Sequence, residues 1–292
     1  MRLPEWIKTG KVIGDHKTKK VLRSHGVSTV CEEARCPNKG HCFSKPTATF
    51  MILGDSCTRN CGFCSVNSSR PALPDPLEPE KIALASKEMG LRYVVITSVT
   101  RDDLPDGGAG QFAETITMVR RYLPKARIEV LTPDFFGNRD AVKTVLKARP
   151  DVFNHNIETV PRLYSQVRPQ AVYRRSLEVL KAAQETAPSI PTKSGLMVGL
   201  GESFDEVISV MRDLRSVGCR ILTIGQYLRP GRENLPVTEY VRPEVFDRYR
   251  EVALELGFSF VASAPLVRSS MNAEEMYSAR EDGADPTPEL PC

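Results

Sequence analysis

From residue 48 onward, the chain alternates between short apolar runs and segments in which apolar residues recur every three or four positions. The short runs are rich in β-branched and aliphatic residues and predict buried strands. They are residues 49–54, 93–99, 127–131, 152–157, 193–198, 220–224 and 258–262. The segments with the longer period predict amphipathic helices. They are residues 81–90, 112–123, 139–148, 173–180, 204–214 and 245–256.

Strands and helices that alternate in this way indicate βα units and a parallel sheet. Six such units are too few for a closed eight-stranded barrel, so we predict an α/β fold, a partial (β/α)6 barrel, over residues 48–263. In such folds the reacting groups lie at the C-terminal ends of the strands. Two further regions are expected, an N-terminal extension over 1–47 and a C-terminal extension over 264–292.

The two extensions differ from the barrel in composition. The first is basic and predicts an irregular arm, which is either solvated or a docking surface for an acidic partner. Its lysines and arginine outnumber its acids and include Lys8, Lys11, Lys17, Lys19, Lys20 and Arg23. The C-terminal extension ends in residues 280–292, whose proline and acidic residues predict a disordered tail.

Composition narrows the class of protein. Of the 292 residues, 41% are hydrophobic and 26% are charged, which excludes a wholly disordered chain. The net charge of +4 is too mild to indicate a nucleic-acid partner. No apolar run approaches the roughly 18 residues that a membrane helix needs, and the first residues lack the apolar core of a signal peptide. We therefore expect a cytoplasmic protein without membrane contact.

Six of the eight cysteines lie between Cys31 and Cys64, where a reducing compartment favours metal binding over disulfides. Cys57, Cys61 and Cys64 form a C-x3-C-x2-C motif directly after the first predicted strand. Three thiolates can hold three irons of a [4Fe–4S] cluster and leave the fourth iron open to a ligand. A structural zinc site requires four ligands, and this segment offers three cysteines.

Cys31, Cys36 and Cys42 form a second motif, C-x4-C-x5-C, in the N-terminal extension. Two three-cysteine sites imply two clusters. From the residues alone, a non-catalytic iron–sulfur or zinc-binding protein remains an alternative to an enzyme. The two distant cysteines are expected to be a core thiol, Cys219, and a tail thiol, Cys292.

The C-x3-C-x2-C motif, with Phe63 before its last cysteine, resembles the signature of the radical S-adenosylmethionine (SAM) superfamily. Beyond it, nearly the whole chain is similar to the lipoyl synthase family. The similar segments are residues 31–38, 95–108, 155–161, 167–170, 192–202, 223–230 and 268–270. The trio in Cys31-Glu-Glu-Ala-Arg-Cys36-Pro-Asn and the element Arg268-Ser-Ser270 are specific to that family, which argues against the biotin synthase and methylthiotransferase kinds of sulfur-inserting enzyme.

The resemblance implies a sulfurtransferase that inserts two sulfur atoms into an octanoyl chain attached to a lysine of a lipoyl carrier domain. No side-chain base can deprotonate an unactivated alkyl carbon, so a radical is needed, and a cofactor must supply it. The resemblance assigns the radical-generating cluster and SAM to Cys57, Cys61 and Cys64. It assigns a second [4Fe–4S] cluster, the sulfur donor, to Cys31, Cys36 and Cys42.

The resemblance also implies further site residues. A serine completes the second cluster, and the motif favours Ser270 over Ser269. The family usually has tyrosine at the next position, where this chain has Met271. Contacts to SAM are implied for Phe63, Thr97, Ser98, Asn156, Glu158, Arg168 and Met197.

The partners that the resemblance implies are octanoylated carrier domains, namely the E2 subunits of 2-oxoacid dehydrogenases and the H protein of glycine cleavage. An electron donor such as ferredoxin or flavodoxin and a cluster-repair carrier are implied as well.

Overall fold

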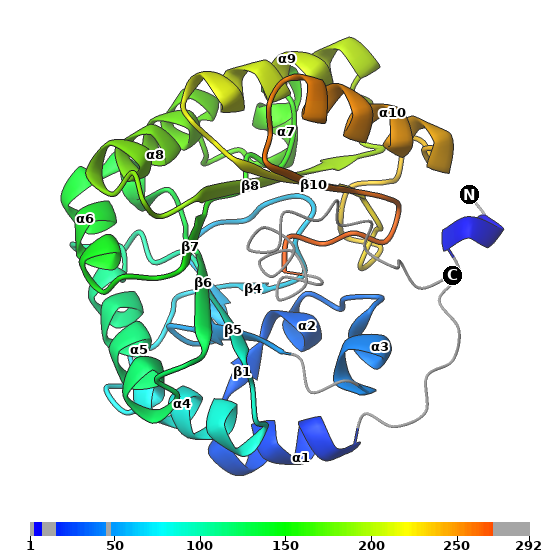
Figure 1. The fold of residues 1–292 in the computed structure, drawn as a ribbon. Coiled ribbons are helices and arrows are strands. Elements are labelled where there is room, and N and C mark those ends of the chain that lie inside the picture. Colours follow the sequence, from blue (N-terminus) through cyan, green and yellow to red (C-terminus); the bar gives the residue numbers. More distant parts are fainter. Residues whose placement is uncertain (1–2, 8–15, 45–47, 271–292) are drawn as a thin grey trace. The chain divides into compact units, whose positions relative to one another are not determined.

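Figure 1 shows the computed structural model, which describes residues 3–7, 16–44 and 48–270. The chain divides into two compact units. The N-terminal unit comprises the described parts of Gly10–Asn60 and Cys64–Phe153. The C-terminal unit comprises the described parts of Met1–Thr9, Cys61–Phe63 and Asn154–Cys292. The predicted tail at 280–292, Met271 and Cys292 lie outside the described residues.

The N-terminal unit is built on four neighbouring strands of a sheet. They are β1 (Ser28–Thr29), β2 (Thr49–Ile52), β5 (Tyr93–Ser98) and β6 (Arg127–Leu131). β2, β5 and β6 pair in parallel, with Thr49 opposite Val95 and Tyr93 opposite Arg127, whereas β1 runs antiparallel to β2. Every residue of β2 is buried, as expected for a strand covered on both faces. The parallel pairing predicted for these strands is confirmed.

Helices α4 (Glu78–Glu88), α5 (Ala109–Tyr122) and α6 (Arg139–Lys147) follow the strands of this unit, with α4 against α5 and α5 against α6. The start of α6 shows the local cause: the Asn138 side chain accepts hydrogen bonds from the amides of Asp140 and Ala141, which satisfies the first turn. The helix then buries Ala141, Val142, Val145 and Leu146.

The N-terminal extension is not the irregular arm that its basic composition suggested. It contains α1 (His16–His25), α2 (Val30–Glu33) and α3 (Lys39–Ser44). In α1 the lysines surround a buried face of Thr18, Val21 and Leu22, spaced as one side of a helix. The Thr18 hydroxyl donates to the carbonyl of Phe43 at 3.0 Å, which joins α1 to α3.

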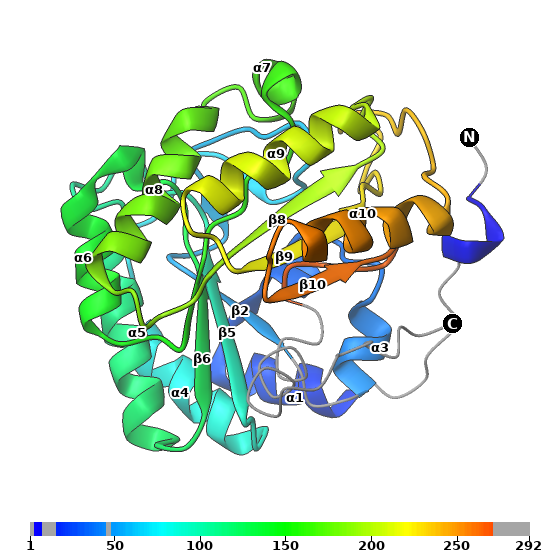
Figure 2. The same cartoon turned by 45° about the horizontal axis from the view of Figure 1, so that its top comes forward.

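The C-terminal unit repeats the βα pattern (Figure 2). Its parallel strands are β8 (Thr192–Val198), β9 (Ile221–Gln226) and β10 (Phe260–Ser263), and its long helices are α8 (Tyr173–Thr186), α9 (Phe204–Ser216) and α10 (Pro243–Glu255). A capping box between Ser203 and Glu206 begins α9. One apolar core joins α9 and β9 through Met211, Leu214 and Leu222.

The strand predicted over 152–157 is shorter than expected. β7 (Val152–Asn154) ends early, and residues 155–158 form a bulge against β8. The amide of His155 donates to Lys193 and that of Glu158 to Gly195, so three steps along one strand face two along the other. Glu158 has φ 65° and then rejoins the sheet opposite Leu196. The regular strand therefore ends at Asn154, three residues before the predicted end at Ile157.

The three-part division at 1–47, 48–263 and 264–292 stays a prediction. Within the described residues, no helix is long and apolar enough to cross a membrane.

Candidate active site

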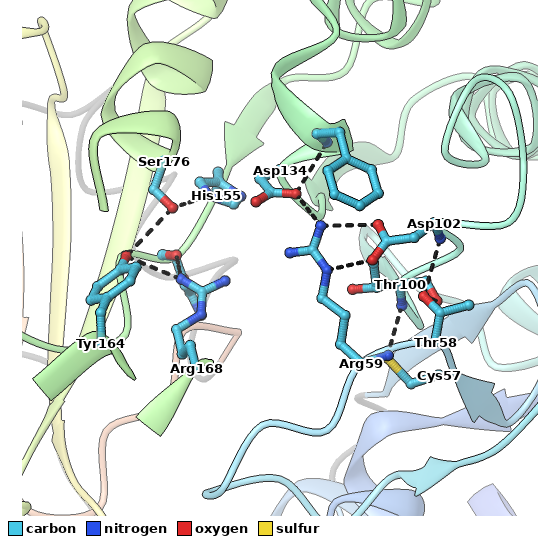
Figure 3. A network of polar contacts seen from close by, with 12 residues as sticks. Cys57, Thr58, Arg59, Thr100, Asp102, Asp134, His155, Tyr164, Arg168 and Ser176 are labelled. Carbon is cyan, nitrogen blue, oxygen red and sulfur yellow. Dashed lines mark hydrogen bonds and ion pairs between the residues drawn. The ribbon is translucent and has the colours of Figure 1, made fainter. Parts of the chain in front are cut away.

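Cys57 lies on the short strand β3 (Ser56–Cys57), which pairs in parallel with β4 (Asn67–Ser68). Its Sγ accepts hydrogen bonds from two backbone amides, Arg59 at 3.4 Å and Thr100 at 3.3 Å (Figure 3). Amide hydrogen bonds to sulfur are among the groups that tune an iron–sulfur cluster. The first cysteine of the motif therefore already has the surroundings of a cluster ligand.

Thr58, which follows Cys57, forms hydrogen bonds with the loop after β5. The Thr58 amide and hydroxyl both donate to the carbonyl of Thr100 at 3.0 Å, and the amide of Asp102 donates to the Thr58 hydroxyl at 3.1 Å. The Thr100 amide reaches Cys57 Sγ in turn. The cysteine and the loop after β5 are thus positioned together.

The Arg59 side chain forms an ion pair on each side of its guanidinium (Figure 3). Nε and Nη2 donate to the two carboxylate oxygens of Asp102 at 2.7 and 2.9 Å, and Nη2 also donates to Asp134 at 2.6 Å. Burial alone would lower the pKa of Arg59, but the hydrogen bonds to Asp102 and Asp134 raise it. The guanidinium is therefore a permanent cation held between two carboxylates.

The middle of the motif, Cys61–Phe63, belongs to the C-terminal unit. The Gly62 amide donates to the carbonyl of Val167, and the Leu235 amide donates to the carbonyl of Gly62, each at 2.9 Å. A Cβ at position 62 would lie 2.9 Å from the Leu235 side chain, so this close approach requires glycine. Phe63 is half-buried and packs on the apolar core of the unit.

The second cysteine trio lies around α2 and α3 of the N-terminal unit. Cys31 is buried, whereas Cys36 and Cys42 are partly exposed. Burial raises the pKa of Cys31 to about 12. The Cys36 amide donates to the carbonyl of Cys31 at 3.2 Å, and that of Cys42 donates to Asn38 at 3.0 Å.

Ser65, which follows Cys64, reaches the second trio: its hydroxyl donates to the carbonyl of Glu33 at 2.8 Å. Glu33 lies between Cys31 and Cys36, so a side chain of one cysteine motif contacts the backbone of the other. None of the seven cysteines in the described residues forms a disulfide. No group of three His, Cys, Asp or Glu side chains in that part of the chain stands ready-made as a metal site.

Two predicted SAM contacts lie at the C-terminal end of β5, and the structure separates them. The Thr97 hydroxyl donates to the carbonyl of Leu131 at 3.0 Å, a bond within the sheet. Ser98 Oγ is buried and has no hydrogen-bond partner among the described residues. A buried polar atom without a partner is costly, so of the two hydroxyl groups it is that of Ser98 which a ligand could satisfy.

Asn156 and Glu158 lie in the bulge after β7. Asn156 Nδ2 donates to Glu158 at 3.1 Å, while Asn156 Oδ1 is buried without a partner in the described chain. Burial raises the pKa of Glu158, against the opposing effects of Arg168 and Asn156. A Cβ on Gly195 would lie 2.9 Å from Asn156 Oδ1, so the glycine leaves room for the amide.

A network that sequence reasoning missed holds the bulge in shape (Figure 3). The Ser194 hydroxyl accepts from the Ile157 amide at 3.1 Å, and Tyr164 donates to the Ile157 carbonyl at 2.7 Å. Arg168, predicted to contact SAM, donates Nη1 to the Asn156 carbonyl at 3.0 Å and lies over the Tyr164 ring. The backbone groups that the bulge releases from the sheet are thereby satisfied.

His155 and Ser176 complete this network, with 3.0 Å between the His155 ring and the Ser176 hydroxyl. The spacing of His155 favoured a core or surface role, and the residue is buried. Only its place in the family-like segment 155–161 could have pointed to the site.

The remaining predicted residues lie in the C-terminal unit. Met197 is on β8, where its amide donates to the carbonyl of Glu158 at 2.9 Å. Ser269 and Ser270 are half-buried in the turn that follows β10 and residues 264–268. Cys219 is buried among the core residues, as predicted.

Two family models match the chain. The radical SAM superfamily matches residues 51–214, and the N-terminal domain of lipoyl synthase of the radical SAM family matches residues 1–36. The chain is 57% identical to a lipoyl synthase of Rubrobacter xylanophilus, over 96% of this chain and 88% of the relative. The chain belongs to the lipoyl synthase family. A lipoyl synthase of Caldanaerobacter subterraneus is 55% identical over 94% of this chain and 96% of the relative.

Solved structures show the same fold for this lipoyl synthase family member. Streptococcus suis SuiB bound to S-adenosylmethionine superposes with a TM-score of 0.59 at 12% identity, over 90% of this chain and 59% of that one. Methylornithine synthase gives a TM-score of 0.53 at 13% identity, over 96% of this chain and 95% of that one. The predicted α/β radical SAM barrel is confirmed.

Membership in the lipoyl synthase family confirms the predicted enzyme and its function, lipoyl synthesis by radical sulfur insertion. A radical SAM enzyme works with a [4Fe–4S] cluster and SAM, and a lipoyl synthase acts on a lipoyl carrier domain. A non-catalytic metal protein is thereby excluded.

Proposed function

We propose that Cys57, Cys61 and Cys64 hold the [4Fe–4S] cluster that binds SAM, and that Cys31, Cys36, Cys42 and Ser270 hold a second cluster that donates sulfur. The observation that carries this proposal is the placement of the family matches. The superfamily model spans the first trio, and the lipoyl synthase N-terminal model includes Cys31 and Cys36. The two amide hydrogen bonds to Cys57 Sγ and the hydrogen bond from Ser65, next to Cys64, to the Glu33 carbonyl within the second motif support it.

When bound, the two clusters and SAM supply a 5′-deoxyadenosyl radical and the sulfur that two unactivated carbons of the octanoyl chain receive. The chain's own residues bind and orient these groups. Thiolates are the ligands that cluster iron prefers, and Ser270 contributes a harder oxygen donor. A harder donor suits soft iron less well, so we propose that Ser270 leaves one iron of the second cluster easy to remove.

For SAM we propose contacts from Phe63, Thr97, Ser98, Asn156, Glu158, Arg168 and Met197. The unpartnered Ser98 Oγ and Asn156 Oδ1 support the polar contacts, because a ligand satisfies buried atoms that the described chain leaves open. An arginine suits the SAM carboxylate because its guanidinium presents parallel donors to two oxygens. Arg168 also holds the Asn156 carbonyl, so the same side chain orients its neighbours in the site.

We propose as carriers the octanoylated E2 subunits of 2-oxoacid dehydrogenases and the H protein of glycine cleavage. Ferredoxin or flavodoxin is the proposed electron donor, a separate carrier protein rebuilds the second cluster, and the cytoplasm is the proposed compartment. These assignments follow from the family relationship.

Mass spectrometry of an octanoylated lipoyl-domain peptide tests the proposal. The peptide is incubated anaerobically with cluster-reconstituted protein, SAM and a strong reductant. We expect a gain of two sulfur atoms with no net change in hydrogen, because each of two C–H bonds becomes C–SH; oxidation of the isolated dithiol peptide to the disulfide then removes two hydrogen atoms. Release of deoxyadenosine without sulfur gain would contradict lipoyl synthesis on this carrier, and release of neither product by protein that holds both clusters would contradict the whole assignment.

Two cysteine variants separate the clusters. We expect Cys57→Ala to release no deoxyadenosine, because the cluster that binds SAM loses a ligand. Cys36→Ala should still release deoxyadenosine and transfer no sulfur. If both variants lost deoxyadenosine release, or if both retained it, the assignment of different roles to the two cysteine trios would be contradicted.

A further inference from the structure

The ion triad of Arg59, Asp102 and Asp134 is unusual for its depth. The Arg59 side chain is 3% exposed and that of Asp134 is fully buried, while Asp102 is 19% exposed. Desolvation makes such buried ion pairs poor sources of net stability, since apolar residues of the same volume often do as well. A buried triad next to a cysteine motif therefore calls for a role beyond folding.

The triad is attached to the cysteine at both ends. Arg59 supplies one of the two amides that hydrogen-bond to Cys57 Sγ. Asp102 lies two residues after Thr100, which supplies the other amide. The Arg59–Asp102 pair thus ties together the two backbone segments that aim N–H groups at the sulfur.

The third member fixes the guanidinium from the opposite side. Asp134 accepts from Arg59 and also from the amide of Phe136, which caps a short 3₁₀ helix, η2 (Phe135–Gly137). The Phe136 ring is 5.1 Å from the Arg59 guanidinium carbon. Arg59 therefore has one orientation, set by groups after β5 and after β6.

The triad also carries charge on residues next to the cysteine: Arg59 lies two positions after Cys57, and Asp102 lies two positions after Thr100, whose amide donates to Cys57 Sγ. One cation between two carboxylates leaves a net charge of −1 beside Cys57. Net charge and hydrogen bonds to sulfur both influence the reduction potential of an iron–sulfur cluster. Arg59 offsets one of the two carboxylate charges, and loss of its cation would expose both.

We propose that Arg59 is a positioning residue for the SAM-binding cluster: it holds the two amides against Cys57 Sγ and shields the cluster from Asp102 and Asp134. This inference rests on the proposed role of Cys57 as a cluster ligand. It assigns to Arg59 a share in setting the reduction potential and in retaining the iron.

The test measures the reduction potential of the SAM-binding cluster and the rate at which a chelator removes its iron. It uses full-length protein with Cys36→Ala, so that only one cluster is present. We expect Arg59→Gln to lower the potential, because an added electron then meets two unshielded carboxylates. Asp102→Asn should raise it, because a negative charge is removed. Opposite shifts support the proposal, whereas shifts of the same sign, or no shifts, would overturn it.

Arg59→Lys separates charge from geometry and remains informative if Arg59→Gln fails to fold. Lysine keeps the cation but lacks the fork that reaches two carboxylates at once. We expect a potential close to that of the parent protein and iron loss at least severalfold faster. Unchanged iron loss would contradict the positioning role.

Arg120→Lys is the matched control. Arg120 lies in the same unit and pairs with Asp151 at 2.9 Å, beside the start of β6 and away from Cys57. It should change neither potential nor iron retention, and an effect equal to that of Arg59→Lys would overturn a specific role. Failure of the Cys36→Ala parent protein to bind any cluster would count against the proposed function instead.

Discussion

The Cys57 loop of the N-terminal unit and the bulge at 155–158 of the C-terminal unit are both held by polar networks, but the networks differ in kind (Figure 3). The network near Cys57 consists of ion pairs, in which the Arg59 guanidinium contacts the carboxylates of Asp102 and Asp134. Around the bulge, hydroxyl groups and an arginine satisfy backbone groups, as Tyr164 and Arg168 do for Ile157 and Asn156.

The two regions also differ in what they leave open. Both backbone amides near Cys57 point to its sulfur, and the carboxylates are paired. The bulge leaves Asn156 Oδ1 without a partner in the described chain and holds the Glu158 carboxyl where burial disfavours its charge. The polar groups around Cys57 are thus paired with one another, whereas the bulge keeps one buried polar atom without a partner in the described chain.

The largest difference between the two regions should be the difference between the effects of Cys57→Ala and Asn156→Ala on the cluster and on SAM binding. Loss of the Cys57 ligand removes the SAM-binding cluster and with it all deoxyadenosine release. Loss of one amide at the bulge should leave the cluster in place and raise the KM for SAM about tenfold, the equivalent of one hydrogen bond. Iron analysis and steady-state kinetics measure the two effects. Loss of the cluster in Asn156→Ala would contradict the assignment of the bulge to SAM binding alone.

A substitution in the charged network should also lower the free energy of unfolding more than a substitution in the neutral network. Asp134→Asn leaves a buried guanidinium with one carboxylate, and breaking a buried pair costs about 3–5 kcal/mol in the free energy of unfolding. Ser176→Ala removes a hydroxyl from the neutral network at a cost of about 1 kcal/mol. Urea unfolding of the iron-free proteins measures both. Equal losses would show that charge is not what distinguishes the regions.

Gly195→Ala tests whether the space beside Gly195 determines the position of Asn156. The new Cβ would lie 2.7 Å from Thr223 Oγ1 and 2.9 Å from Asn156 Oδ1, so Asn156 must move. We expect a loss of about 1–3 kcal/mol in unfolding free energy, as for other overpacked sites, and weaker SAM binding. Gly110→Ala in α5 is the control, because it lies in the N-terminal unit and its new Cβ would come no closer than 3.1 Å to another atom, Asp106 Oδ2. Full SAM affinity in Gly195→Ala would contradict the role of Asn156.

The smallest effect concerns pH. Because burial raises the pKa of Glu158 above its ordinary value of 4.5, ionisation of this carboxyl costs stability as the pH rises through and above that value. Glu158→Gln should therefore raise the unfolding temperature of the iron-free protein at pH 7, and the gain should vanish below pH 4.5. A gain that is the same at pH 3 and pH 7 would exclude the carboxyl charge as its cause.

Local pattern explains why most of the barrel could be predicted. The strand at 127–131 was predicted with the bounds that the structure gives, because Ile128, Val130 and Leu131 form a short apolar run and a proline follows it at position 133. Helix α9 was predicted from a clear apolar stripe, now seen as buried Val207, Met211 and Leu214. In these segments local propensity and tertiary packing agree.

The failures arise where packing partners are distant or the apolar signal is short. In α1 only Thr18, Val21 and Leu22 are buried, and the surrounding lysines dominated the pattern. The bulge that follows β7 involves the Ser194 hydroxyl and the positive φ of Glu158, and neither is visible in the sequence from Val152 to Ile157.

The site shows the same division. The cysteines and the bulge residues were found through motifs, but the partners of Arg59 were not. Asp102 and Asp134 follow different strands, and only the parallel sheet brings the loops after β5 and β6 together. Thr97 and Ser98 are neighbours in sequence, yet their hydroxyl groups have different surroundings because successive residues of a strand point to opposite faces.

The backbone pairing of Gly62 has a consequence for how the protein is made. Its partners, Val167 and Leu235, are translated long after the six clustered cysteines have left the ribosome. A nascent chain that stops short of Leu235 carries every cysteine of both motifs, yet the loop around Cys61 lacks one of its two backbone anchors. The cysteine motif is therefore synthesised early, but its loop gains its last backbone hydrogen bond only after most of the C-terminal unit has been translated.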